Sequence, residues 1–208
     1  MNNQKGFTLI ELAIVLVVIG IILGAILKSQ ELIKNAKARR FQNDVKALEA
    51  IIWMFYDRYG RFPGDCNLDG LIDASTNNTV GAIDNNPNIK FCEEMGGNEP
   101  EDLDAPWAEL KKAQLVSNVS NLQLSSTPLG GTIYIGKADN RNAIAIAGIP
   151  CFAAKMIDVS IDGRLDGGFG RVRELTGPDT ARNSTDVWTT CNTEETLVNI
   201  VYFFDREP

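Results

Sequence analysis

The chain begins MNNQKG and continues FTLIELAIVLVVIGIILGAIL from Phe7 to Leu27. Within this run only Glu11 is charged, and Lys28 follows it directly. As an α-helix, the run would be roughly 31 Å long, close to the thickness of the hydrocarbon core of a bilayer. The stretch therefore predicts a helix that can lie in a membrane, and it decides the architecture of the chain.

The helical pattern continues from Lys28 to Tyr59, a segment without proline or glycine. Apolar residues recur at mostly three- and four-residue steps, which is typical of an amphipathic helix. They are Leu32, Ala36, Phe41, Val45, Leu48, Ile52, Phe55 and Tyr59. Gly60 and Pro63 provide an end signal. We expect one helix of roughly 80 Å, apolar in its first half and carrying a buried stripe in its second.

Composition excludes several classes of function. The chain has 208 residues, a formal net charge of -7, four cysteines and no histidine. An acidic protein is not expected to bind nucleic acid or an anionic membrane surface. Without histidine there is no imidazole base, no Ser-His-Asp triad and no histidine-ligated zinc.

The apolar run could be a cleaved secretory signal, a plain signal anchor, or a segment in which Glu11 has a role. A secretory signal has a shorter apolar region than this one. A carboxylate inside a lipid-length helix costs roughly 2.5–3.5 kcal/mol, so it usually marks function. The boundary from Lys5-Gly6 through Phe7 to Glu11 closely resembles the class III signal of type IV pilins and of type II secretion pseudopilins.

The resemblance implies that prepilin peptidase cleaves between Gly6 and Phe7 and methylates the new amine of Phe7. It implies a single-pass inner-membrane protein with a periplasmic head, which an assembly platform then adds to a filament of pilin-like subunits. In that filament Glu11 of one subunit would neutralise the terminal amine of another, whereas in lipid the carboxylate would be unpaired.

Beyond the helix, the sequence predicts an α+β head with mainly antiparallel strands. Strands are expected at 131–136, 142–147 and 197–204, with 137–141 as a hairpin connection. The predicted parts are a leader (1–6), an assembly segment (7–27), an amphipathic helix (28–59) and a head (60–208). The Pro-Gly-Asp turn at 63–65 and the segment around Trp107 and Leu110 resemble a subset of pilin-like proteins. We expect both of the latter side chains in the core.

The loop that begins at Asp65 has the ligand spacing of a calcium site. Oxygen ligands stand at positions 1, 3 and 5, glycine at 6, a carbonyl at 7 and aspartate at 9. The candidates are Asp65, Asn67, Asp69, Leu71 (by its carbonyl) and Asp73. Position 12 is Thr76 rather than glutamate, so Glu93 or Glu94 would have to complete the site. The alternative is a polar surface turn.

A second match to the same pattern runs from Asp158 to Asp166. Residues 150–162 are better interpreted as an amphipathic helix with Pro150 at its first position and Gly163 just after its end. The pattern therefore favours a capped helix over a second calcium loop.

All four cysteines follow the apolar run, and a head outside the cytoplasm would favour two disulfides. Three connectivities exist and the sequence does not choose among them. We favour the adjacent pairs, Cys66 with Cys92 and Cys151 with Cys191. The second pair resembles a C-terminal disulfide common in the pilin family.

The sequence favours a structural subunit of a type IV pilus or a secretion pseudopilus, with no catalytic residue. One alternative is a minor pilin-like adhesin or binding module whose Cys66–Cys92 insertion, with or without calcium, recognises a partner. Another is a membrane-anchored hydrolase. Its aspartates, however, cluster with turn glycines, as ligands or solvated turns do.

Overall fold

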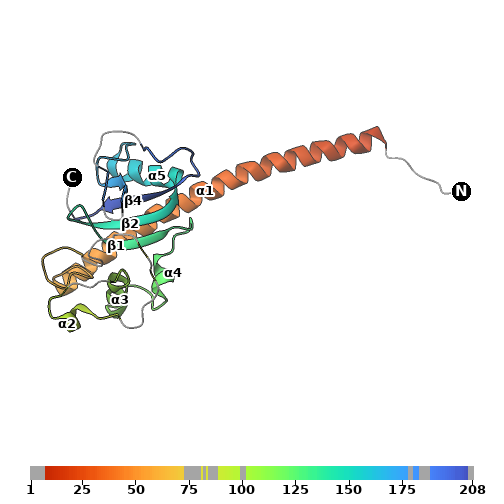
Figure 1. Cartoon of the computed structure of the whole chain (residues 1–208). Coiled ribbons are helices and arrows are strands. Elements are labelled where there is room, and N and C mark those ends of the chain that lie inside the picture. The colour runs from red at the N-terminus through yellow and green to blue at the C-terminus, as the bar shows by residue number, and fades with distance from the viewer. Residues whose placement is uncertain are drawn as a thin grey trace. The chain divides into compact units, whose positions relative to one another are not determined.

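The computed structural model describes residues 8–72, 81, 83, 89–98, 102–177, 180–182 and 188–205. The chain forms two compact units, Met1–Arg39 and Arg40–Pro208. Helix α1 (Leu9–Tyr59) begins in the first unit and ends in the second. Figure 1 shows that the remaining elements belong to the head.

The first unit contains the apolar part of α1. Every residue from 8 to 37 is exposed, including large aliphatic side chains such as Leu9 and Ile21. Among the described residues, α1 is the one helix long and apolar enough to cross a membrane. The apolar surface of this segment therefore has no partner within the part of the chain that the structure describes.

In the head, the second part of α1 buries five residues of the predicted stripe, whereas Leu32, Ala36 and Tyr59 of that stripe are exposed. Phe41, Val45, Leu48, Ile52 and Phe55 are each at most 5% exposed. Their alternating steps of four and three residues keep them on one side of a helix. Gly60 follows with a φ of +70°, and its N–H donates to the Tyr56 carbonyl, which is the predicted glycine end of the helix.

The head contains a four-stranded antiparallel sheet in the order β1-β2-β4-β3. The strands are β1 (Thr132–Ala138), β2 (Arg141–Pro150), β3 (Val172–Glu174) and β4 (Leu197–Phe203). The β1–β2 connection is only two residues long, shorter than predicted. Asp139 and Asn140 both have positive φ, so they form a tight hairpin turn and the strands extend to it.

A polar contact fixes α1 to the sheet within the head. The Tyr202 hydroxyl, on β4, donates to Oε2 of Glu49 on α1 at 2.6 Å. Arg171 donates to both Tyr202 and Glu49. Because Tyr202 is only 2% exposed, these bonds satisfy polar atoms that packing removes from water.

Four short helices complete the described head: α2 (Cys92–Met95), α3 (Ala105–Lys112), α4 (Asn121–Ser125) and α5 (Cys151–Asp162). Trp107 and Leu110 on α3 are buried, as predicted. Pro150, predicted as the first residue of the helix, is instead the last residue of β2 and the N-cap residue of α5, so the helix begins at Cys151. Gly163 ends that helix, as predicted, with a φ of +70°. Asp158 is therefore helical and belongs to no second calcium loop.

Candidate functional site

The N-terminal candidates lie partly outside the described residues. Gly6 and Phe7, the predicted cleavage pair, are not described. Thr8 precedes the first turn of α1, and its N–H and hydroxyl both donate to Glu11 Oε2 at 2.8 Å. The Glu11 N–H donates in return to the Thr8 hydroxyl at 3.3 Å. Thr8 and Glu11 thus form a capping box at the start of the helix.

This capping box changes the expectation for Glu11 in a single chain. The sequence predicts an unpaired carboxylate in lipid, but Oε2 accepts two hydrogen bonds from Thr8. Both donors are neutral groups, so they stabilise the negative charge of Glu11 by hydrogen bonding but do not neutralise it. A cationic partner would still stabilise it, because two opposite unit charges attract strongly in a medium of low dielectric constant.

In the head, the loop after α1 contains the candidate calcium ligands. Asn67 Oδ1 accepts from the Asp69 N–H at 2.8 Å, and Asp69 Oδ1 accepts from the Leu71 N–H at 2.8 Å. Gly70 has a φ of +86°, which allows the sharp turn at position 6. Asp73 lies outside the described residues. The structure thus places four of the five predicted ligands in one compact turn.

Asp65 differs from Asn67 and Asp69, the other candidate side-chain ligands, because it is 2% exposed whereas they are exposed. Its Oδ2 accepts from the Gly70 N–H at 3.2 Å, while its Oδ1 is buried without a hydrogen-bond partner. Burial raises the pKa of the Asp65 carboxyl, and hydrogen bonds from the backbone of Leu68 and Gly70 oppose the rise. A buried carboxylate oxygen with no donor is costly unless something else binds it.

The other proposed ligands of this loop have partners elsewhere. Glu93 forms an ion pair with Lys112 at 2.6 Å, and Glu94 accepts from the Phe91 N–H at 3.4 Å. Across the described ranges, no three histidine, cysteine or acidic side chains converge on one point. The described carboxylates of the loop are Asp65 and Asp69 alone.

Disulfides join Cys66 to Cys92 and Cys151 to Cys191. These are the adjacent pairs that we favoured from the sequence. The first closes the insertion that contains the candidate loop. The second connects the N-terminus of α5 to the segment before β4, whose residues Thr196 and Glu194 accept from the backbone of Cys151 and Phe152.

Glu109 organises the start of the insertion, and sequence reasoning missed it. This side chain on α3 is 4% exposed. It accepts both guanidinium N–H groups of Arg61, at 2.7 and 2.8 Å, and the backbone N–H groups of Gly64 and Cys92. A single carboxylate therefore holds the turn after α1 and one end of the first disulfide. Nothing in the local sequence distinguishes it from a surface glutamate of a short helix.

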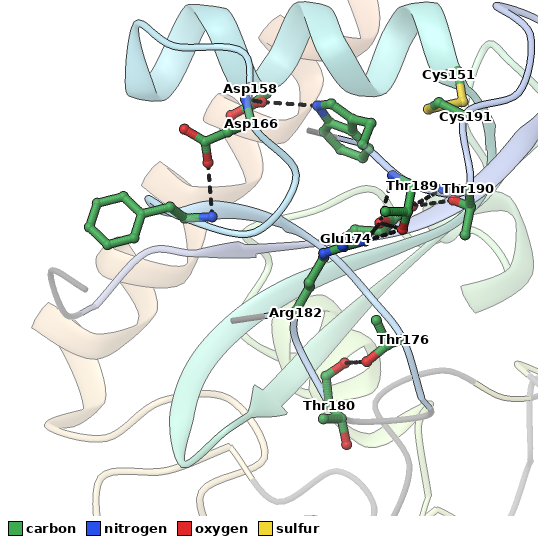
Figure 2. Close-up of polar contacts among 12 residues, drawn as sticks. Cys151, Asp158, Asp166, Glu174, Thr176, Thr180, Arg182, Thr189, Thr190 and Cys191 are labelled. Carbon is green, nitrogen blue, oxygen red and sulfur yellow. Dashed lines mark hydrogen bonds and ion pairs between the residues drawn. A yellow bond between two sulfur atoms is a disulfide. The ribbon is translucent and has the colours of Figure 1, made fainter. Parts of the chain in front are cut away.

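A second polar cluster holds the segment before β4 to the sheet (Figure 2). Glu174 on β3 is 1% exposed and accepts from Arg182, Thr189 and Thr190. Nearby, Asp158 on α5 accepts from Trp188 Nε1 at 3.1 Å and from the Asp166 N–H at 2.9 Å. These contacts fix loop conformation, and each carboxylate is enclosed rather than open to a substrate.

Comparison with known proteins identifies the N-terminal segment. Residues 1–27 match the family model described as the prokaryotic N-terminal methylation motif. This is the prepilin-type signal of type IV pilins and pseudopilins. No curated protein and no solved structure matches the chain significantly.

Proposed function

We propose that this chain, which carries a prepilin-type signal, is a structural subunit of a filament of the type IV pilus or type II secretion pseudopilus class. The proposal rests on one observation: the signal runs without a break into the apolar part of α1. The motif covers residues 1–27, and the helix that follows its cleavage boundary exposes apolar side chains on all sides. Such a helix needs lipid or neighbouring helices around it.

In the proposed pathway, prepilin peptidase removes residues 1–6 and methylates the amine of Phe7. Removing the leader takes away Lys5, so the formal charge changes from -7 to -8. Before assembly the apolar part of α1 anchors the chain in the inner membrane with the head in the periplasm. The assembly platform then transfers the helix from lipid into the filament, where copies of the chain or other pilins surround it.

Glu11 favours the transfer of the helix from lipid into the filament. In a single chain its carboxylate accepts hydrogen bonds from the neutral donors of Thr8. In the filament it exchanges them for the methylated amine of a neighbouring subunit, which neutralises both charges in a medium of low dielectric constant. The role of the chain is therefore assembly rather than catalysis.

The properties of the head support an extracytoplasmic position. All four cysteines are paired in disulfides, as is typical of proteins in oxidising compartments. Most of the negative charge belongs to the head, which would form the outer surface of the filament. Glu11 and the new amine of the helix start would cancel each other.

The mass of the mature chain tests this proposal. The full chain is expressed with and without a prepilin peptidase, extracted in detergent and measured intact. With the peptidase we expect loss of residues 1–6 and one added methyl group on Phe7. Without it, Met1–Gly6 should remain. Retention of Met1 in the presence of an active peptidase, or a cut near Leu27, would contradict the proposal.

A further inference from the structure

The turn from Asp65 to Leu71 has the composition and the shape of an oxygen-donor cation site. We propose that it binds one calcium ion through side-chain oxygens of Asp65, Asn67 and Asp69 and the main-chain carbonyl of Leu71. These residues occupy positions 1, 3, 5 and 7 of a calcium loop, and Gly70 occupies position 6, where the chain must turn sharply. The inference does not depend on the filament role, because it concerns the head alone.

The buried carboxylate of Asp65 is the observation that points to a ligand. The side chain is 2% exposed and is directed into the turn, where Oδ2 accepts from the Gly70 N–H. Oδ1 has no hydrogen-bond donor and no contact with solvent. Proteins rarely bury a carboxylate oxygen without a partner, because the loss of hydration is not repaid. A cation bound at Oδ1 would supply the missing partner.

The charge around the turn favours a cation. Within the described part of the chain, no basic side chain forms an ion pair with Asp65 or Asp69. Asn67 and Asp69 are exposed, so their side chains can turn to an ion without disturbing the core. Carboxylate, amide and carbonyl oxygens without a strict octahedral arrangement suit calcium better than magnesium, which requires near-ideal octahedral geometry.

The rest of the head holds this turn in place. Asn142, a fully buried residue of β2, accepts from the Ile72 N–H and donates to the Gly70 carbonyl, both at 2.7 Å. At the other end, Cys66 is tied to Cys92 by a disulfide. Both ends of the turn are therefore fixed to the scaffold, which lowers the conformational entropy that ion binding must overcome.

Thermal unfolding of the full chain in a non-ionic detergent tests the proposal, after removal of metal with a chelator. A site with a Kd of about 0.1 mM, in the range of extracellular calcium modules, would be about 99% occupied at 10 mM calcium. For a chain of this size we expect Tm to rise by about 5–10 °C relative to excess chelator. Magnesium at 10 mM should produce a clearly smaller shift.

Three variants locate the ion. Asp69→Asn keeps the turn-forming oxygen but removes a charge, and we expect about tenfold weaker binding and a roughly halved Tm shift. Asp65→Asn should lose the shift, yet in chelator it should be at least as stable as the wild type because no charge is then buried. The control is Asp139→Asn, at an exposed position of the β1–β2 turn, which should keep the full shift.

Isothermal titration should find one calcium ion per chain in the wild type and in Asp139→Asn. Equal Tm values in calcium and chelator for the wild type would overturn the proposal. So would equal calcium shifts in Asp65→Asn, Asp69→Asn and Asp139→Asn, because the ion would then bind elsewhere. If Asp65→Asn does not fold, the exposed Asp69→Asn variant decides the question.

Discussion

At the scale of single residues, buried carboxylates differ in how completely they are satisfied. Burial acts to raise the pKa of Glu174, but hydrogen bonds from Thr190, Thr189 and Arg182 outweigh it, and the pKa lies below its usual value. Asp158 is equally buried but has fewer donors, and its Oδ1 has no hydrogen-bond partner. Desolvation therefore dominates and raises the pKa of Asp158 to about 7.

This raised pKa predicts a pH dependence of stability that belongs to Asp158. The pKa is higher in the folded chain than in the unfolded one, so the folded state binds the proton more tightly. The stabilising contribution of the Asp158 carboxyl is complete below its pKa in the unfolded chain, which is near 4. It declines as pH rises and is lost above the folded-state pKa of about 7. Between pH 5 and pH 8 the free energy of unfolding of the wild type should fall by roughly 2–3 kcal/mol because of this group.

Asp158→Asn removes the titration while keeping an oxygen that can accept from Trp188. Urea unfolding in detergent at pH 5 and pH 8 should show that the stability advantage of the wild type over the variant shrinks by that amount. Asp139→Asn, at an exposed turn, should show no such change. A constant difference between the wild type and Asp158→Asn at both pH values would contradict the prediction.

At the scale of elements, α3 connects parts of the head that are far apart in the sequence. Its Glu109 binds Arg61 just after α1 and the backbone N–H groups of Gly64 and Cys92. The Arg61 side chain is itself only 13% exposed, so the pair is largely shielded from solvent. Helix α3 therefore holds together the beginning and the end of the Cys66–Cys92 insertion.

Glu109→Gln should be strongly destabilising. The amide cannot accept both guanidinium hydrogen bonds, and the Arg61 charge is left buried without a counter-ion, which costs about 3–5 kcal/mol. We expect a large fall in the urea midpoint with the disulfides intact. The matched control is Glu93→Gln, which breaks the exposed pair with Lys112 and should change the midpoint little. Similar urea midpoints for the two variants would contradict this role of Glu109.

At the scale of the whole molecule, the chain combines a unit that exposes its apolar surface with a unit that buries its own. The head has a closed core around the sheet, two disulfides and a buried stripe of α1. The first unit has no such core, and residues 8–37 are all exposed. A division of this kind suits a subunit whose N-terminal helix becomes part of a larger assembly.

Glu11→Gln tests assembly separately from processing. The glutamine oxygen can still accept from Thr8, so the capping box and the cleavage by prepilin peptidase should persist. Loss of the charge pair, worth about 3 kcal/mol or more when buried, should reduce the filament fraction by roughly 100-fold. Sedimentation of sheared filaments measures this fraction, and intact mass reports processing.

The control for this variant is Glu31→Gln, which removes another exposed carboxylate of α1. It should assemble as the wild type does. Filaments of Glu11→Gln at the wild-type level would show that the charge of Glu11 does not direct assembly.

The sequence alone determined the features whose causes are local. The apolar run and its 3.6-residue continuation predict α1, because side-chain periodicity along one segment is enough to define a helix and its buried stripe. Gly60 and Gly163 predict helix ends because they tolerate positive φ. The hairpin between β1 and β2 was also expected, although its turn proved tighter. The signal at residues 1–27 needs no tertiary contact to be recognised.

Only the tertiary structure decided the contacts between distant segments. Strand β3 is three residues long and forms because β4 pairs with it, so no pattern in its own sequence predicts it. Glu109, Asp158 and Asn142 resemble ordinary surface residues until the fold buries them against donors from elsewhere in the chain. Whether Asp65 is a solvated turn residue or a carboxylate that needs a cation also depends on burial. Burial is a property of packing, because desolvation depends on which segments exclude water from a side chain.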